Sequence, residues 1–338
     1  MADKPKFIVV IGASAGGVAA LSELVGQLST KMDAAFFVVM HLSATAISDF
    51  LVHRLQPHTN LKCIVATDAA PIERGHIYIA PPNQHLIVIR DQIVVGHGPK
   101  ENSWRPSIDV LFRSAAAAYN SHVLGIILTG FLNDGTAGMM AVKQSGGICI
   151  VQDPNEAEVP DMPVSVLNNV EVDYSISLAN MGEVVSGLLE DDPKEVEAPS
   201  QVIAEADIAA RMAVGIERIN GLGKHSVYNC PDCGGGLWQI SGEEITRYRC
   251  YTGHTYNEDE LLAKLGDNVE STLWVAVRMM EERSNMYSKI ARDNRKKGLA
   301  RISESYDKNA DELKRHIDTL RDMLVLIQKR RAENREAH

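Results

Sequence analysis

The chain has 338 residues, a formal net charge of −10, 45% hydrophobic residues and 23% charged residues. This length and composition allow a full α/β domain plus a smaller module, and they exclude disorder over most of the chain. The acidic balance argues against a protein that binds nucleic acid across its surface. No apolar run approaches the roughly 18 residues needed to enter and cross a bilayer, and no secretory signal is visible, so we expect a cytoplasmic protein.

The first 150 residues alternate between apolar runs and helical patterns. The apolar runs have the composition of buried parallel strands and occupy residues 7–11, 36–40, 123–128 and 148–151. Helical patterns follow the first three of them, at residues 18–28, 48–55 and 135–144. A strand followed by a helix is the pattern of βαβ units. The sequence therefore predicts an α/β fold with a doubly wound, mostly parallel sheet.

The region between the second and third of these strands has a different pattern. Short strands at 76–80, 86–89 and 92–95 are separated by Pro-Pro-Asn and Asp-Gln turns. Such turns favour antiparallel hairpins, which we expect to be added to the sheet. A helix is predicted from Pro106 to Tyr119, because proline suits the first helical turn.

The second half of the chain indicates separate parts. Residues 191–200 are acidic, hold two prolines and lack an apolar period, which is typical of a linker. We therefore predict an N-terminal α/β domain at 1–190, a linker at 191–200 and a C-terminal region at 201–338. That region is expected to contain, in order, a helix at 202–219, a cysteine-rich module at about 226–257 and further helices to about residue 331.

The segment Gly12-Ala13-Ser14-Ala15-Gly16 fits the G-x-S-x-G pattern, with a predicted strand before it and a helix after it. That context suits a nucleophile elbow, in which small neighbours expose the serine and helix-start amides receive an oxyanion. The same glycines could simply join a strand to a helix. A phosphate site is also conceivable, but the G-x-G-x-x-G spacing and a P-loop lysine are both missing.

A serine nucleophile needs a base and a group that orients the base. His41 directly follows the strand at 36–40, and Asp134 lies just beyond the strand at 123–128. Because the C-terminal ends of parallel strands share one edge, we expect Ser14, His41 and Asp134 to converge there. Singly, the histidine could be an edge residue and the aspartate a helix N-cap. The order Ser, His, Asp disfavours the α/β-hydrolases, which run Ser, acid, His.

Taken together, these motifs resemble those of the catalytic domain of CheB, the chemoreceptor protein-glutamate methylesterase family. The resemblance covers about residues 6–189. It is carried by Ile11-Gly12-Ala13-Ser14-Ala15-Gly16-Gly17, Met40-His41, Tyr78-Ile79-Ala80-Pro81, Arg105-Pro106-Ser107-Ile108-Asp109-Val110-Leu111-Phe112, Leu128-Thr129-Gly130 and Asn133-Asp134-Gly135.

The resemblance implies hydrolysis of a glutamate γ-methyl ester on a methylated chemoreceptor or similar signalling protein, with release of methanol. Ser14 would attack the carbonyl, His41 would transfer the proton and Asp134 would orient the imidazole. An acyl-enzyme follows, and glutamine deamidation would use the same chemistry. The backbone N–H groups of Ala15 and Phe131 are the expected oxyanion donors, and no catalytic cofactor is expected.

Three features depart from the family pattern. Ala15 stands where family enzymes often have threonine, and Phe131-Leu132 replaces the commoner Met-Gly. Because the first predicted strand begins at Phe7, we expect no receiver domain ahead of the esterase. Phosphoryl control would then come from a separate receiver-type regulator.

The cysteine-rich module predicts a metal site. Cys230 and Cys233 form a C-x-x-C turn, and Cys250 and His254 follow at a distance suited to a second ligand turn. Three thiolates and an imidazole favour tetrahedral zinc in a closed, structural, zinc-ribbon-like site. The rival interpretation is a redox C-x-x-C, but no thioredoxin-like βαβ context surrounds it.

Two questions stay open from the sequence. The apolar positions of the C-terminal helices fit either a hairpin that packs on itself or a surface for a partner or second copy, since a two-helix element has little core. They are Leu273, Val277, Met280, Met286, Ile317, Leu320, Leu324 and Ile327. The chain could also be a catalytically weak signalling adaptor that binds a receptor-like partner, or a hydrolase acting on another ester or amide.

Overall fold

The computed structural model describes residues 4–42, 49–210, 221–240 and 245–336, with side chains as far as Lys329. Residue 48 of the helix predicted at 48–55, and residues 211–219 of the helix predicted at 202–219, lie outside this range. The chain divides into two compact units, residues 1–260 and 261–338. No helix among the described residues is long and apolar enough to cross a membrane.

The first unit is built around a seven-stranded sheet in which every neighbouring pair is parallel, as predicted. Its strand order is β3-β4-β2-β1-β7-β8-β9. The strands are β1 (Phe7–Ala13), β2 (Ala34–Met40), β3 (Lys62–Val65), β4 (His76–Ile79), β7 (Val123–Ile127), β8 (Ile148–Gln152) and β9 (Tyr174–Ile176).

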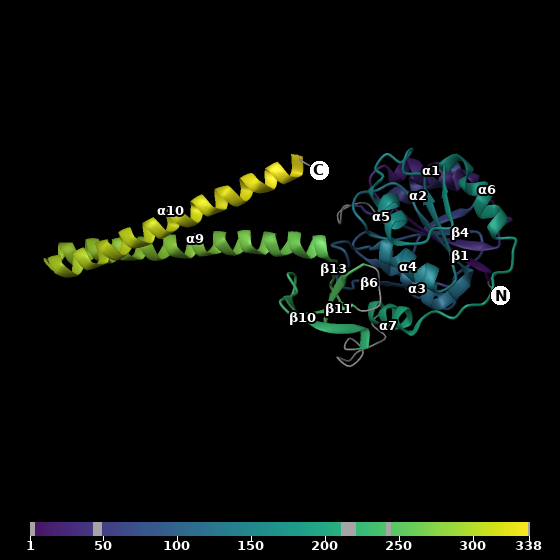
Figure 1. Cartoon of the computed structure of the whole chain (residues 1–338). Coiled ribbons are helices and arrows are strands. Elements are labelled where there is room, and N and C mark those ends of the chain that lie inside the picture. The colour runs from purple at the N-terminus through teal and green to yellow at the C-terminus, as the bar shows by residue number, and fades with distance from the viewer. Residues whose placement is uncertain (1–3, 43–48, 211–220, 241–244, 337–338) are drawn as a thin grey trace. The chain divides into compact units, whose positions relative to one another are not determined.

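Helices cover both faces of this sheet (Figure 1). One face packs against α1 (Gly17–Gln27), α2 (Phe50–Leu55) and α6 (Leu178–Leu188). The other packs against α3 (Ile108–Tyr119), α4 (Thr136–Gln144) and α5 (Asp161–Asn169), and short 3-10 helices occupy Gln56–His58 and Asn120–His122. Successive side chains of β1 alternate between the two cores, Val9 on one face and Val10 on the other. This explains why β1 is apolar throughout.

One predicted pairing is wrong. The strand at His76–Ile79 was expected in an antiparallel hairpin, but it runs parallel to β2 and β3 within the main sheet. Its Tyr78 stacks on Phe37 of β2, with ring centroids 5.0 Å apart. The expected antiparallel hairpin is formed instead by β5 (His85–Ile89) and β6 (Gln92–Gly96), as a separate two-stranded sheet. Turn residues at the ends of a short strand do not specify its partner.

The cysteine-rich module is a small antiparallel sheet, which we call the ribbon. It follows α7 (Ser200–Ala209) and consists of β10 (Gly223–Asn229), β11 (Gly236–Ile240), β12 (Arg247–Cys250) and β13 (Thr255–Asn257). The strands pair in chain order. The ribbon belongs to the same compact unit as the seven-stranded sheet.

The second unit is an antiparallel helical hairpin made by α9 (Glu258–Lys296) and α10 (Ala300–Glu336). Val277, Ile317 and Leu324 are its buried apolar core. The predicted helical region is therefore present, and these three residues are among the apolar positions that the sequence pattern predicted. Met286, which the same pattern placed among the apolar positions, is 55% exposed.

Candidate active site

Ser14 lies in the three-residue connection between β1 and α1, and its side chain is partly exposed. Its backbone N–H donates to the carbonyl oxygen of Thr129 at 2.9 Å, and its own carbonyl accepts from the N–H of Gly17 at 2.9 Å. Gly16 has φ +74°, a left-handed conformation that favours glycine. The chain therefore turns sharply at Ser14, between the strand and the helix start, as a nucleophile elbow requires.

The loop after β7 packs directly against this turn, and Gly130 makes the approach possible. A Cβ atom at Gly130 would lie 2.7 Å from Cβ of Ser14 and 2.2 Å from Sδ of Met162. Both distances are shorter than van der Waals contact. The glycine thus lets the backbone of the loop reach the serine.

His41 and Asp134 are in direct contact. His41 follows β2, and its backbone N–H donates to the carbonyl oxygen of Ala13 at 3.2 Å, next to Ser14. Nε2 of His41 lies 2.8 Å from Oδ2 of Asp134, and both side chains are 1% exposed. Nδ1 of the same ring is buried and has no hydrogen-bond partner in the described part of the chain. The three predicted residues thus follow three adjacent strands, β2, β1 and β7.

Asp134 is buried among hydrogen-bond donors at the start of α3. Besides His41, four groups donate to its carboxylate: the Asn102 side-chain amide (3.0 Å), the Ser107 hydroxyl (2.9 Å), and the backbone N–H groups of Ile108 (2.7 Å) and Asp109 (3.3 Å). Burial alone would raise the pKa of Asp134. The hydrogen bond and charge of His41, with the other donors, hold that pKa below its ordinary value. The carboxylate is therefore ionised and oriented toward the imidazole.

Asp109 is a second buried carboxylate beside Asp134. Burial, followed by the nearby charge of Asp134, raises the pKa of Asp109 to about 7. Its Oδ2 accepts from the Asn102 side-chain amide at 2.6 Å, and its Oδ1 accepts from the N–H groups of Gly135 and Gly138. The Asn102 amide therefore bridges the two carboxylates.

Two residues that contact the candidate triad were not found from the sequence. Asn102 donates to Asp134, and the Trp104 ring stacks on His41 with centroids 4.0 Å apart and planes 4° apart. Both lie in the connection between β6 and α3, which has no periodic pattern. The sequence did contain one signal for the surroundings of Asp134. Ser107, which donates to it, lies in the Arg105–Phe112 motif, but no role was assigned to it.

The expected oxyanion donors lie in the loops that follow β1 and β7, as Ser14 and Asp134 do. The backbone N–H groups of Ala15 and Phe131 have no acceptor among the described residues. The side chains of Phe131 and Leu132 are 58% and 57% exposed, and Leu132 has φ +65°, which is rare for a branched residue. An apolar rim therefore stands beside the candidate site.

Comparison with known proteins covers the part of the chain that holds these residues. The sequence model of the CheB methylesterase family matches residues 9–185, more than half of the chain. The chain belongs to the CheB methylesterase family. This confirms the resemblance found from the motifs around Ser14, His41 and Asp134.

Individual members of the CheB family are similar to the same part of the chain. A putative protein-glutamate methylesterase/protein-glutamine glutaminase of Leptospira interrogans is 37% identical over 177 residues, covering 52% of this chain and 91% of the relative. A protein-glutamate methylesterase/protein-glutamine glutaminase of Sulfurimonas denitrificans is 35% identical, covering 54% of this chain and 52% of the relative. The crystal structure of the Thermotoga maritima CheB methylesterase catalytic domain is 31% identical with a TM-score of 0.52, and it covers 56% of this chain and 100% of that domain.

The ribbon brings its four predicted ligands together. The Sγ atoms of Cys230, Cys233 and Cys250 and a ring nitrogen of His254 lie within 4.8 Å of one another. Sγ of Cys233 is 3.7 Å from Sγ of Cys250, and Nδ1 of His254 is 3.4 Å from the latter. Tetrahedral zinc with Zn–S bonds of about 2.3 Å separates two sulfurs by about 3.8 Å. The four residues therefore fit a metal ion of that geometry.

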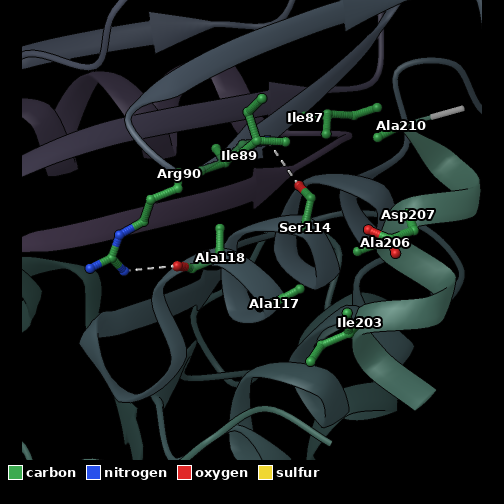
Figure 2. A pocket seen from close by; sticks show the side chains of 11 residues that line it. Ile87, Ile89, Arg90, Ser114, Ala117, Ala118, Ile203, Ala206, Asp207 and Ala210 are labelled. Atoms are coloured by element: carbon green, nitrogen blue, oxygen red, sulfur yellow. Dashed lines mark hydrogen bonds between the residues drawn. The ribbon is translucent and has the colours of Figure 1, made fainter. Parts of the chain in front are cut away.

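A separate cavity of about 190 Å³ lies between β5, α3 and α7 (Figure 2). Its lining is mainly aliphatic, including Ile87, Ala117 and Ile203. Neither the triad residues nor the four metal-ligand candidates line it. The cavity is therefore distinct from both candidate sites.

Proposed function

We propose that the protein hydrolyses glutamate γ-methyl esters on a chemoreceptor-like protein through a Ser14, His41, Asp134 triad. The observation that carries the proposal is the His41 pair: Nε2 faces the Asp134 carboxylate at 2.8 Å, while Nδ1 is buried without a partner in the described region. An imidazole fixed in this way keeps its Nδ1 lone pair available as a base.

Acylation begins when Oγ of Ser14 attacks the ester carbonyl and Nδ1 of His41 takes the hydroxyl proton. Asp134 stabilises the resulting imidazolium through its bond to Nε2. The tetrahedral oxyanion accepts hydrogen bonds from the N–H groups of Ala15 and Phe131. His41 then returns the proton to the leaving oxygen, so methanol departs and the glutamyl group remains on Ser14.

Deacylation repeats the same proton movements with water as the nucleophile. Nδ1 of His41 takes a proton from the water as it attacks the acyl carbon, and then protonates Oγ of Ser14 as the bond to the enzyme breaks. The products are a glutamate side chain and free Ser14. A glutamine substrate would release ammonia in place of methanol by the same route.

The protein substrate would dock against the apolar rim. Phe131 and Leu132 are exposed beside the triad, where a helix carrying the esterified glutamate can place apolar neighbours. Such receptor helices lie on the cytoplasmic side of the membrane, which places the enzyme in the cytoplasm without membrane insertion. A separate receiver-type protein is the proposed regulator.

The test is methanol release from methylated receptors of the host, comparing wild type with Ser14→Ala. Ser22→Ala is the matched control, because Ser22 lies in α1 and its hydroxyl donates within that helix, to the Val18 carbonyl at 2.8 Å. We expect no methanol from Ser14→Ala, retained receptor binding, and wild-type release from Ser22→Ala.

Two results would contradict the proposal in different ways. Equal methanol release by wild type and Ser14→Ala would exclude Ser14 as the nucleophile. Receptor binding by wild type without methanol or ammonia release from any host receptor would instead favour the adaptor function.

We also infer that the ribbon holds structural zinc through Cys230, Cys233, Cys250 and His254. Four protein ligands complete a tetrahedral shell and leave no open position for substrate, as in structural zinc sites. The zinc content of purified protein checks this, with about one zinc per chain expected. Cys233→Ser should lose the metal, whereas Cys63→Ala, which alters a buried thiol of β3, should keep it. Equal zinc content in the two variants would contradict the site.

A further inference from the structure

The segment Glu101–Trp104, which we call the 101–104 loop, contacts two triad residues. The Asn102 side chain donates to Oδ1 of Asp134 at 3.0 Å, and the Trp104 ring stacks on His41 at 4.0 Å. One contact is with the acid and the other covers a face of the imidazole. A displacement of this loop would therefore remove a hydrogen bond from Asp134 and the stacked ring from His41.

The other side of the 101–104 loop is bound by the ribbon. Glu101 forms a parallel bridge with Thr255 of β13, and the backbone N–H of Asn102 donates to the Thr255 carbonyl at 3.1 Å. Nη1 of Arg249, on β12, lies 3.2 Å from Oε1 of Glu101. The ribbon thus contacts the residues that contact the triad.

The ribbon also contacts the residue before Asp134. The side-chain amide of Asn257 in β13 donates to Oδ1 of Asn133 at 2.9 Å. The acid of the triad is therefore connected to β13 by two routes, through Asn133 along the chain and through Asn102 by hydrogen bonds.

The 101–104 loop is a tight turn that closes on itself. The Trp104 N–H donates to the Glu101 carbonyl at 2.9 Å, and the Glu101 N–H donates to the Trp104 carbonyl at 3.2 Å. Asn102 and Ser103 between them have φ +50° and +64°, as a two-residue turn of this kind requires. The loop therefore has a defined local shape, and its contacts with the ribbon fix where it lies.

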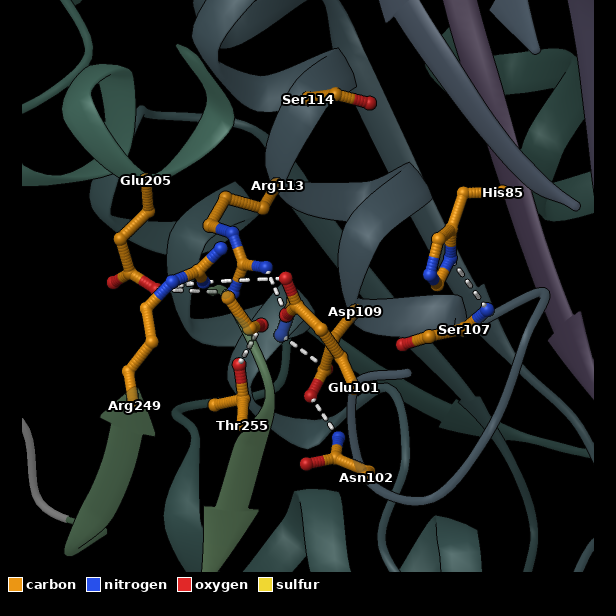
Figure 3. Close-up of polar contacts among 12 residues, drawn as sticks. His85, Glu101, Asn102, Ser107, Asp109, Arg113, Ser114, Glu205, Arg249 and Thr255 are labelled. Carbon is orange, nitrogen blue, oxygen red and sulfur yellow. Dashed lines mark hydrogen bonds and ion pairs between the residues drawn. The ribbon is translucent and has the colours of Figure 1, made fainter. Parts of the chain in front are cut away.

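A buried ion network fixes the ribbon against α3 and α7 (Figure 3). Glu101 and Glu205 are the anions; Arg113 of α3 and Arg247 and Arg249 of β12 are the cations. All five side chains are at most 3% exposed. Buried charges tolerate little displacement, because losing one partner leaves another charge desolvated. Moving the ribbon away from α3 and α7 would therefore leave buried charges without their partners.

The metal-ligand candidates adjoin both ribbon contacts. Arg249 precedes Cys250, and Thr255 follows His254, at the two ends of the turn between β12 and β13. The turn is closed by the Cys250 N–H, which donates to the His254 carbonyl at 3.0 Å. A metal ion bound by both residues would hold this turn, and with it Arg249 and Thr255.

We propose that the ribbon is a positioning element of the esterase, in which metal binding fixes the 101–104 loop and so keeps His41 and Asp134 in their reactive arrangement. The proposal rests on the proposed esterase activity. Arg249 and Asn102 are positioning residues, since they act through the triad and touch no substrate. Catalytic turnover therefore depends on metal in a site that does no chemistry itself.

The test compares the full chain with zinc, after chelation, after zinc is returned, and as Arg249→Gln. We expect kcat to fall at least tenfold on chelation and in Arg249→Gln, KM to change less than threefold, and returned zinc to restore kcat. Val227→Ala is the matched ribbon control, because this β10 side chain is 91% exposed. Its kcat should equal that of wild type. An unchanged kcat after chelation would overturn the proposal, and an increased kcat would make the ribbon an inhibitory cover.

A second readout needs neither turnover nor a folded Arg249 variant. The chain has three tryptophans, so Trp238→Phe with Trp274→Phe leaves Trp104 as the only indole emitter. Chelation should change Trp104 emission as the ring leaves His41, and zinc should reverse the change. Unchanged emission would overturn the inference even if no receptor substrate is found, whereas a reversible change without methanol release would reject the esterase alone.

Discussion

Nε2 of His41 and Oδ2 of Asp134 lie 2.8 Å apart, and each side chain is 1% exposed. In the serine proteases the aspartate binds Nδ1 and the serine faces Nε2. Here Nε2 lies against the aspartate, so the proposed base is Nδ1. A triad needs only that one ring nitrogen be held by the acid while the other faces the nucleophile, so this arrangement supports the same chemistry.

Asp134→Asn should lower kcat by about 10³- to 10⁴-fold while the fold is retained. An amide that donates to Nε2 would leave the proton on Nδ1, which then cannot accept the proton of Ser14. Methanol release kinetics with circular dichroism measure this. Asp192→Asn, at a side chain that is 92% exposed, is the control and should keep wild-type kcat. A loss of less than tenfold in Asp134→Asn would contradict the role of the pair.

Gly130→Ala should destabilise the protein by about 2 kcal/mol or more and lower kcat, because the new Cβ would overlap Met162 and Ser14. Gly187→Ala is the matched control. It lies in α6, its Cβ would meet nothing within 4 Å, and alanine favours a helix by up to about 1 kcal/mol. Urea unfolding and methanol release distinguish the variants. Similar values for both would show that the loop does not approach the serine closely.

Glu101→Gln should show a stability loss that depends on pH. Burial would raise the pKa of Glu101, but Arg113 and Arg249 lower it to about 2. A carboxyl group whose pKa is lower in the folded than in the unfolded protein stabilises the fold at pH values above its unfolded pKa of 4.5. This stabilisation is lost as the pH falls toward the folded pKa of about 2. The free energy of unfolding of Glu101→Gln should therefore be about 3 kcal/mol lower than that of wild type at pH 7. This difference between the two proteins should shrink below pH 4.5.

Urea unfolding between pH 7 and pH 3 measures this difference. The control is Glu183→Gln, which changes an exposed carboxylate on α6 and should give a small difference at every pH. A constant deficit for Glu101→Gln across this range would mean that the Glu101 charge does not stabilise the fold.

Phe131→Ala should raise KM for a methylated receptor by about five- to tenfold and leave kcat nearly unchanged. The substitution removes an exposed apolar side chain worth roughly 1–1.5 kcal/mol of contact with a docked helix, but keeps the backbone N–H. Steady-state methanol release separates the two parameters. A fall in kcat at constant KM would place the Phe131 side chain at the reacting atoms instead.

The sequence could predict where the candidate triad residues lie, because their signals are local and the topology brings the strand ends together. Ser14, His41 and Asp134 each follow an apolar strand, and parallel strands end at one edge. The direction of β4 had no such signal, because a four-residue strand bounded by turn residues fits either a hairpin or a parallel edge. Its pairing with β2 and β3 depends on distant contacts such as Tyr78 with Phe37.

The residues that surround the candidate triad could not be predicted from the sequence, because they too depend on distant contacts. Asn102 lies in a short loop without periodicity, and its partner Asp134 is 32 positions away. Glu101 and Arg249 read as ordinary surface charges, because charged side chains are seldom fully buried. Only the packing of the ribbon makes them a buried pair, with Arg249 1% exposed. The contacts between the ribbon and the 101–104 loop therefore required the structure.

The nucleophile is identified most directly by the site of labelling with a serine-reactive fluorophosphonate, located by peptide mass spectrometry. We expect one phosphonyl group per chain, on Oγ of Ser14, with no labelling of Ser14→Ala and labelling at least about a hundredfold slower in His41→Gln. Labelling of another serine, or equal rates in wild type and His41→Gln, would contradict a Ser14 nucleophile activated by His41.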